Sequence, residues 1–185
     1  VSRIFGDEYS MGQSEPTSVQ LTDFDPDGEN KVVAAILYSH SHKSENELLK
    51  DVEKMSVEDK TEILQAYVGE RSNRRHKPGR AFERTSYRFD ILSDYGAFRD
   101  LQRHRMLTIE WQQLTPFHGY DVPESIIEAG VATQFEDILS TSSNLFSALS
   151  ERFPVGASYA VSLQFKLRYV MQMNVREAMH LTELR

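Results

Sequence analysis

Near the end of the sequence, residues 163–173 place an apolar side chain at every second position. A period of two puts these side chains on one face, which is typical of a β-strand with one buried side. Residues 84–92 and 107–111 repeat the pattern over shorter lengths, and residues 19–22 are a candidate fourth strand. Each such strand must bury its apolar face against another layer of the protein.

Stretches with helical features lie between these strands. Helix N-caps are expected at Ser44, Ser56, Asp94 and Asn174. The corresponding helices cover residues 45–55, 57–68, 95–103 and 175–185, and two further helices are expected over residues 123–139 and 143–153. Residues 31–38 are too uniformly apolar to be assigned by period, so helix and buried strand both remain open.

Helices mixed with strands that are not adjacent in sequence predict an α+β fold. We expect a mixed or antiparallel sheet with helices packed on it, in a single layered domain. Within this domain, residues 1–80 form an N-terminal segment of strand and helices, and residues 81–185 form the core.

The 185-residue sequence contains no cysteine. This excludes a cysteine nucleophile, a thiolate metal site and a disulfide. Nothing indicates an oxidising compartment, so the cytoplasm is the expected location. The longest apolar run, residues 32–38, is far shorter than the ~20 residues that cross a bilayer, and no membrane partner is expected. The chain begins with Val1 and shows no signal peptide, as expected of a processed chain or an excised fragment.

The charge is unevenly distributed along the chain. The net charge is −7, yet residues 71–105 carry 10 Lys and Arg against 4 Asp and Glu. One basic segment in an acidic protein indicates a localised anion site. The overall acidity argues against a nucleic-acid partner, so an RNA or polyphosphate binder is the least favoured function.

The basic segment ends in three consecutive residues, Arg103, His104 and Arg105. Two guanidiniums and an imidazole can hold a phosphate through charge-assisted, bidentate hydrogen bonds. The pattern alone favours a blander interpretation, which is a solvated helix C-terminus where the helix dipole attracts cations.

A second cluster lies at the start of the last expected helix, at Asn174, Arg176 and His180. Arg176 and His180 are four residues apart and share one helix face, and a helix that begins with Asn and Arg can bind an anion through its free N–H groups. Arg185 is about half a turn out of phase with Arg176. The alternative is an amphipathic surface helix with residues 179 and 181 buried.

Other motifs of catalysis are missing from the sequence. His40 and His42 have strand-like spacing, but a surface turn is the favoured interpretation and no metal site is predicted. A glycine-rich phosphate loop, a His-Glu-x-x-His zinc motif and a Gly-x-Ser-x-Gly nucleophile elbow are all absent.

Taken together, these pieces resemble the flavin-dependent thymidylate synthase (ThyX) family. The family signature begins Arg-His-Arg-x-x-Ser, which here runs from Arg103 to Thr108. A Phe-Glu-His element upstream corresponds to Phe82-Glu83-Arg84. A late Asn-x-Arg-Ser helix that ends in Leu-Arg corresponds to residues 174–177 and 184–185. The resemblance covers residues 80–185, and the longer N-terminal part is typical of chains that carry this domain in tandem.

The resemblance implies the fold of thymidylate synthase complementing proteins and a homotetramer with active sites between subunits. It implies FAD, reduced by NADPH, and transfer of a methylene group from methylenetetrahydrofolate to dUMP with hydride from the flavin. Such chemistry needs no protein cysteine, whereas other thymidylate synthases attack uracil with a thiolate. By the same resemblance, the flavin contacts are Arg103, His104, Arg105, Thr108, Asn174, Arg176 and His180, and Arg185 contacts the uracil of dUMP.

The departures cluster in the part of the signature that binds the dUMP phosphate. Gln113 and Thr115 replace its Ser and Arg, and Ser158 stands where a further arginine is expected. Neutral side chains cannot replace charge-assisted bonds to a phosphate. The sequence therefore predicts an FAD-dependent thymidylate synthase-like protein with reduced or altered activity. The alternative is a non-catalytic copy that completes the oligomer of an active partner domain.

Overall fold

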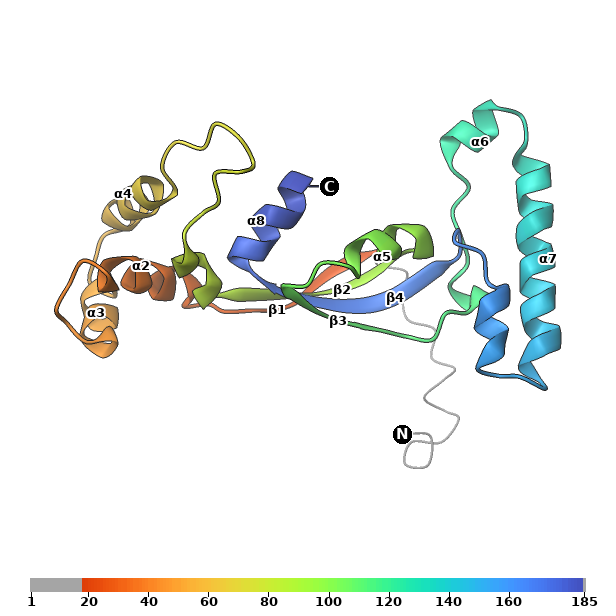
Figure 1. Ribbon diagram of the computed structural model, residues 1–185, viewed down its shortest axis with the longest axis horizontal. Helices are drawn as coiled ribbons and strands as arrows, with labels where there is room; N and C mark the ends of the chain where they lie inside the picture. Colours follow the sequence, from red (N-terminus) through yellow and green to blue (C-terminus); the bar gives the residue numbers. More distant parts are fainter. Residues whose placement is uncertain (1–17, 185) are drawn as a thin grey trace.

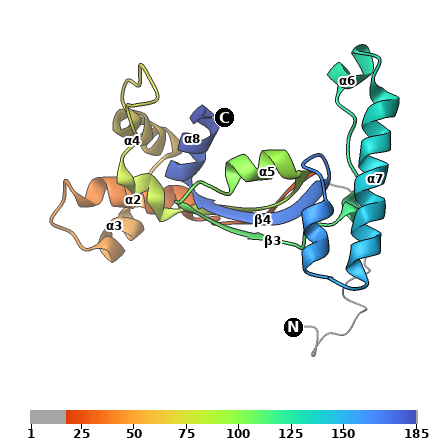
Figure 2. The same cartoon turned by 45° about the vertical axis from the view of Figure 1, so that its right-hand side comes forward.

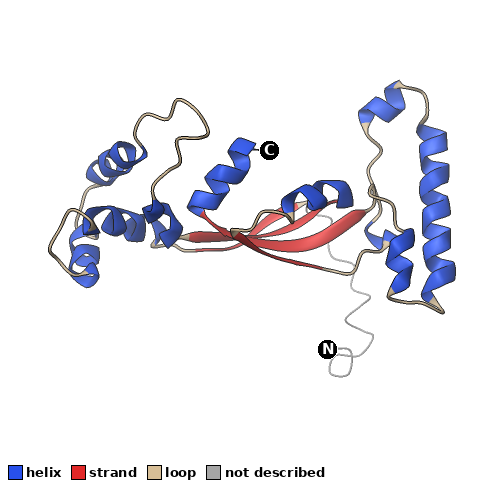
Figure 3. Ribbon diagram, in the orientation of Figure 1, coloured by secondary structure: helices blue, strands red, loops and turns tan. Residues whose placement is uncertain are grey.

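A four-stranded antiparallel sheet forms the centre of the protein (Figure 3). The structure is a computed structural model that describes residues 18–184. The strands are β1 (Val19–Phe24), β2 (Ser86–Asp94), β3 (Leu107–Trp111) and β4 (Lys166–Asn174), in the spatial order β1-β2-β4-β3. The predicted α+β fold is confirmed, and every strand pair is antiparallel.

Seven α-helices accompany the sheet among the described residues. They are α2 (Gly28–Tyr38), α3 (Glu45–Val52), α4 (Val57–Val68), α5 (Tyr95–Leu101), α6 (Glu124–Glu128), α7 (Ala132–Ser150) and α8 (Val175–Leu184). Short 3₁₀ turns are η2 (Arg80–Arg84), η3 (Pro116–His118) and η4 (Gly156–Ala160). No helix of residues 18–184 combines the length and apolar character of a membrane span.

The predicted N-caps are confirmed at four helices. Ser44 forms the full capping box with Glu47, and Ser56 and Asp94 accept a hydrogen bond from the backbone N–H three residues later. Asn174 does the same at the start of α8, where its Oδ1 accepts from the backbone N–H of Glu177 at 2.9 Å. Each cap satisfies one of the free N–H groups of a first helical turn.

Two predicted boundaries are wrong. The expected helices over 123–139 and 143–153 are instead the short α6 and one long α7, separated at Gly130, whose φ of +71° only glycine adopts easily. The expected strand over 163–173 begins at Lys166, because the carbonyl of Leu163 accepts from the N–H of Gly96 and the Leu163 side chain is 56% exposed.

One face of the sheet carries the largest core. Every second residue of β4, from Leu167 to Met173, is buried there together with Ile91 of β2 and Phe98 of α5. Helices α5 and α8 lie side by side on this same face (Figures 1 and 2), and Ala178 and Leu181 of α8 pack onto the cluster.

Smaller cores lie at the two ends of the sheet. At one end α2, α3 and α4 pack together, and Val32 and Ile36 of α2 share a cluster with Val175 and Met179 of α8. At the other end α7 packs against η4 and the segment that leads into β4. The elongated molecule of Figure 1 thus has helices at both ends of a central sheet.

Candidate functional site

Three segments far apart in sequence meet at one end of the sheet. Asn174, the last residue of β4, pairs with Ser86 at the start of β2, and Met173 pairs with Leu107 at the start of β3. In antiparallel strands the start of one lies beside the end of its neighbour. Turn η2 before β2, the turn at residues 102–106 before β3, and α8 after β4 therefore surround one cleft.

A buried hydrogen bond joins two of these segments. Nδ1 of His104 lies 3.2 Å from Oε1 of Glu177, and the side chains are only 6% and 7% exposed. A buried carboxylate is costly without a hydrogen-bonding partner, so each group supplies what the other needs. The ring of His180 lies close by, with its centroid 6.1 Å from that of His104.

The basic loop at residues 69–79 is fastened to α8 by two polar contacts. Nζ of Lys77 lies 2.8 Å from Nδ1 of His180, and the guanidinium of Arg71 pairs with Glu183. The loop connects α4 to η2 and approaches α8 along its side (Figure 1). The loop thus brings Lys77 of the predicted basic segment to the lining of the cleft.

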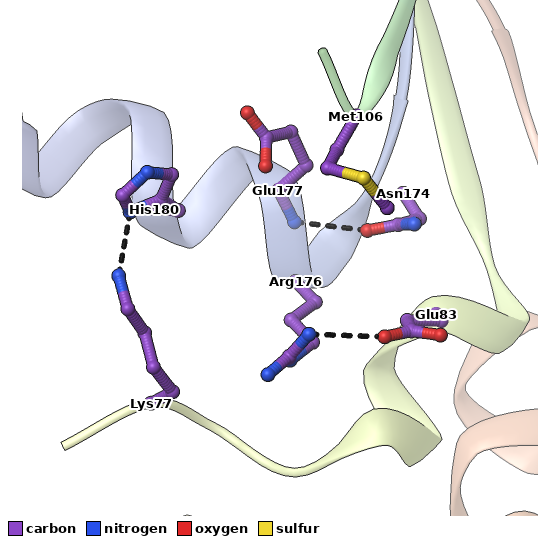
Figure 4. A pocket seen from close by; sticks show the side chains of 7 residues that line it. All are labelled: Lys77, Glu83, Met106, Asn174, Arg176, Glu177 and His180. Carbon is purple, nitrogen blue, oxygen red and sulfur yellow. Dashed lines mark hydrogen bonds and ion pairs between the residues drawn. The ribbon is translucent and has the colours of Figure 1, made fainter. Parts of the chain in front are cut away.

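Arg176 joins α8 to η2. Its Nε donates to the carbonyl of Pro78 at 2.9 Å. Its Nη1 lies 3.1 Å from Oε1 of Glu83, as Figure 4 shows. Arg80 also pairs with Glu83, and hydrogen bonding from Arg80, with support from Arg176, holds the pKa of the Glu83 carboxyl below its usual value. Arg176 therefore serves the architecture of the cleft as well as its charge.

Two adjoining cavities make up the cleft. The first, of about 200 Å³, is lined by Lys77, Glu83, Met106, Asn174, Arg176, Glu177 and His180 (Figure 4). The second, of about 560 Å³, is lined by Arg103, His104, Arg105, Met106, Glu177, His180 and Leu184. Six of the eight residues predicted to form a site, from two distant motifs, therefore line one cleft.

The guanidiniums of Arg103 and Arg105 remain available to an anion. Among residues 18–184, Arg103 pairs only with Asp100, at 2.9 Å with both side chains more than half exposed, and such surface pairs are weak. Arg105 makes no ion pair with any other residue in the range 18–184. Two guanidiniums at the mouth of a cleft can bind phosphate oxygens through charge-assisted bonds.

Of the two other predicted residues, the structure places only Thr108, and it lies apart from the cleft. Thr108 pairs with Gln172 in the β3–β4 ladder, while its neighbours Leu107 and Ile109 face the core under α5 and α8. The side chain of Thr108 therefore points to the opposite face of the sheet. Arg185, predicted to contact uracil, lies outside the described residues.

The residues that depart from the nucleotide-binding signature lie at the opposite end of the sheet. Nε2 of Gln113 donates to the carbonyl of Pro154 at 3.2 Å, and Thr115 caps η3 by accepting from the N–H of Phe117. The hydroxyl of Ser158 donates to a carbonyl in the same region. These three side chains hold the chain together locally.

Five lining residues were not predicted as site residues from the sequence: Lys77, Glu83, Met106, Glu177 and Leu184. An acidic residue in the first turn of a helix is common because the helix dipole favours it, so Glu177 carries no signal of its own. Lys77 was part of a basic segment whose individual members looked equivalent. Only the strand register shows that these side chains meet.

Comparison with known proteins identifies the family. A model of the thymidylate synthase complementing protein family matches residues 20–185. The chain belongs to this family. Its membership confirms the resemblance deduced from the Arg-His-Arg and Asn-x-Arg motifs, and the matched range includes both halves of the cleft.

Curated relatives in this family are much longer than the chain. A UPF0159 protein of Chlamydia pneumoniae is 37% identical over 177 residues, which cover 96% of this chain and 33% of the relative. A UPF0159 protein of Thermoplasma acidophilum is 32% identical over 157 residues, with 84% and 31% covered. The chain spans about a third of the length of these relatives.

Two solved structures share the fold. A UMP/dUMP methylase, PolB, from Streptomyces cacaoi, bound with 5-Br dUMP, aligns with a TM-score of 0.67 over 88% of this chain and 75% of its own. ThyX from Helicobacter pylori, with FAD and dUMP, aligns with a TM-score of 0.63 over 91% and 83%. Both are 16% identical to this chain, so they show a common fold.

Proposed function

We propose that this chain is an FAD-dependent thymidylate synthase-like domain that binds the flavin in the cleft between residues 102–106 and α8. The observation that supports this proposal is that residues of two distant motifs line one cleft. Arg103, His104 and Arg105 come from one motif and Asn174 and His180 from another, and all five line the same cleft.

The lining residues fit the chemistry of FAD. Arg103 and Arg105 supply guanidiniums for its two phosphates. Asn174 uses its Oδ1 to cap α8 and keeps its amide N–H₂ for a ring carbonyl. His104 and His180 offer further polar contacts to the ring. A bound flavin supplies hydride chemistry that protein side chains lack.

The full reaction in this proposal is the transfer of a methylene group from methylenetetrahydrofolate to dUMP, with NADPH reducing the flavin and dTMP as product. The role of the protein is chiefly to position the reactants and to place cations near developing negative charge. Gln113 and Thr115 are neutral where the family signature supplies phosphate contacts, so activity is reduced or altered. The cytoplasm remains the expected compartment, because no cysteine points to an oxidising one.

The flavin-binding and nucleotide-binding parts of the family signature lie at different ends of the sheet, which bears on the oligomeric state. The flavin motif precedes β3, and the nucleotide-motif positions Gln113 and Thr115 follow it. The five residues of β3 span about 17 Å. The edge of the sheet therefore separates the flavin motif from Gln113 and Thr115. We propose that a complete site combines this flavin cleft with the nucleotide end of a second copy in a homo-oligomer, with a tetramer expected, or of a tandem partner domain.

An absorbance titration with FAD tests the proposal. The purified chain should acquire a bound-flavin spectrum at one FAD per site, and dUMP should accelerate reoxidation of the reduced flavin. Arg105→Ala should weaken FAD binding roughly tenfold, the value of one charge-assisted bond. Arg152→Ala, at an exposed position beyond α7, is the matched control and should bind FAD normally. A chain that takes up neither FAD nor dUMP contradicts the proposal.

A second function is favoured by the contacts of Gln113, Thr115 and Ser158. All three bond within their own end of the chain, which suits a structural copy that completes the oligomer of an active partner domain. Such a copy should co-purify with an intact family domain and restore its activity, and Arg103→Ala in the copy should lower that activity. A lone monomer that never associates with the intact domain argues against this function.

A further inference from the structure

The hydrogen-bonding state of His180 follows from its partner. A lysine ammonium has three donors and no acceptor. Nζ of Lys77, at 2.8 Å from Nδ1 of His180, must therefore donate to a lone pair on Nδ1. His180 is then neutral and carries its proton on Nε2.

His104 has the reverse arrangement. An ionised carboxylate only accepts hydrogen bonds, so Oε1 of Glu177 must receive the proton of Nδ1 of His104, across 3.2 Å. In the neutral ring the lone pair then lies on Nε2. Both side chains of this pair are almost wholly buried, so water does not compete for the contact.

The two rings are therefore held in opposite states within one cleft. Their centroids are 6.1 Å apart, and both rings line the larger cavity. Nε2 is a donor on His180 and an acceptor on neutral His104, and among the contacts of residues 18–184 neither Nε2 atom has a protein partner. A ligand in the cavity thus meets one donor and one acceptor of fixed character.

We propose that Glu177 and Lys77 are positioning residues that fix His104 and His180 in opposite tautomers, so that the cleft presents a donor–acceptor pair to a planar heterocycle with both N–H and carbonyl groups. The proposal deepens the proposed flavin binding and rests on it for the identity of the ligand. Glu177 stands where the resembling signature has serine, and serine both donates and accepts. Unlike serine, an ionised carboxylate can only accept and so enforces a single tautomer on neutral His104.

Nitrogen-15 NMR of the imidazoles tests the tautomers directly, without any cofactor. Long-range ¹H–¹⁵N correlation spectra at neutral pH distinguish protonated from unprotonated ring nitrogens, and His104→Gln and His180→Gln variants assign the two rings. We expect protonated Nδ1 in His104 and protonated Nε2 in His180. Observation of Nε2–H with bare Nδ1 in His104, or Nδ1–H with bare Nε2 in His180, overturns the proposal.

Substitutions of the partners then test their roles. Glu177→Gln is nearly isosteric and should let His104 populate both tautomers, while Lys77→Met, at an exposed side chain, should do so for His180 without harm to folding. Each should weaken FAD binding several-fold. Glu62→Gln and Lys50→Met, exposed substitutions on α4 and α3, should change neither spectrum nor affinity.

The results separate the two proposals. The positioning role is supported if the wild type shows fixed opposite tautomers and if Glu177→Gln and Lys77→Met each give a mixture of tautomers. If these results are obtained but FAD does not bind, only the proposed flavin function fails. Unchanged tautomer populations in both folded variants overturn the positioning role, whatever the FAD affinity. Thermal unfolding of each variant confirms that the spectra come from folded protein.

Discussion

Asn174 offers a sharp test because it joins the fold to the cleft. Its Oδ1 accepts from the backbone N–H of Glu177 at 2.9 Å and caps α8, and its side chain lines the smaller cavity. Asn174→Ala removes the cap, which costs about 1 kcal/mol. For a chain of 185 residues the melting temperature should fall by about 2–4 °C. Loss of one amide hydrogen bond to the ligand should weaken FAD binding by about fivefold.

A second substitution separates the two effects. Asn174→Ser keeps a cap acceptor but removes the amide, so its melting temperature should stay near that of the wild type while FAD affinity falls as in Asn174→Ala. Ser44→Ala is the matched control, because it removes the cap of α3, which packs against α2 away from the cleft. It should lower the melting temperature to a similar degree and leave FAD affinity unchanged.

Thermal unfolding followed by circular dichroism and FAD titration followed by fluorescence give the two quantities. The reasoning is refuted if Ser44→Ala weakens FAD binding as much as Asn174→Ala does, since affinity would then follow global stability. It is also refuted if Asn174→Ser binds FAD like the wild type, since the amide would then have no role in the cleft.

Three further predictions concern the fold. Leu167→Ala, at a side chain with no exposed surface, should lower the unfolding free energy in urea by about 2–5 kcal/mol. Gly28→Ala should cost about 1–3 kcal/mol because its Cβ would lie 2.3 Å from Oγ1 of Thr85, whereas Gly156→Ala meets only an ordinary 3.5 Å contact and should be tolerated. Burial lowers the pKa of His118 in the folded protein. The contribution of the neutral His118 ring to the free energy of unfolding is therefore complete above its pKa in the unfolded chain, about 6.5. This contribution is lost as the pH falls towards the lower pKa of His118 in the folded protein. Urea midpoints at pH 7 and pH 5 should therefore differ less in His118→Gln than in the wild type.

Much of the fold was predictable because its signals are local. The alternation in residues 84–92 and 107–111 reports the one buried face of each strand, and the N-caps are chemical features of single residues. The secondary structure of residues 31–38 was not predictable from the spacing of apolar residues. Val33 of α2 packs against α3, and Val32 and Ile36 pack against η2 and α4, so the helix is buried on more than one side and shows no amphipathic pattern.

The wrong boundaries have equally physical causes. The polar stretch at residues 140–143 resembled a break, yet its serines sit within α7, where Ser142 donates to the carbonyl of Ala160. The true break at Gly130 is a single residue with positive φ. At the start of β4, Leu163 continues the apolar alternation, but its carbonyl is engaged by Gly96 of α5, a long-range contact that sequence periodicity does not contain.

The candidate site was predictable as two motifs and unpredictable as one cleft. Arg103–His104–Arg105 and Asn174-x-Arg176 were each found from residue chemistry. Their union depends on the pairing of Leu107 with Met173, which is a property of strand register. Lys77 and Glu177 gain their importance only from partners 103 and 73 residues away in sequence, so no local pattern marks them.

The charges of the cleft limit the size of the anion it can take. Arg176 is paired with Glu83, so its charge is largely balanced inside the protein, and His104 is engaged by Glu177. Arg103 and Arg105 at the cleft mouth and Lys77 in its wall are left to meet a ligand. Two or three charges match the phosphates of one nucleotide or flavin, whereas a nucleic-acid binder commonly makes 6–10 phosphate contacts and loses affinity steeply with salt. The salt dependence of FAD binding should therefore be shallow, with a slope set by about two phosphate contacts rather than by the full charge of residues 71–105.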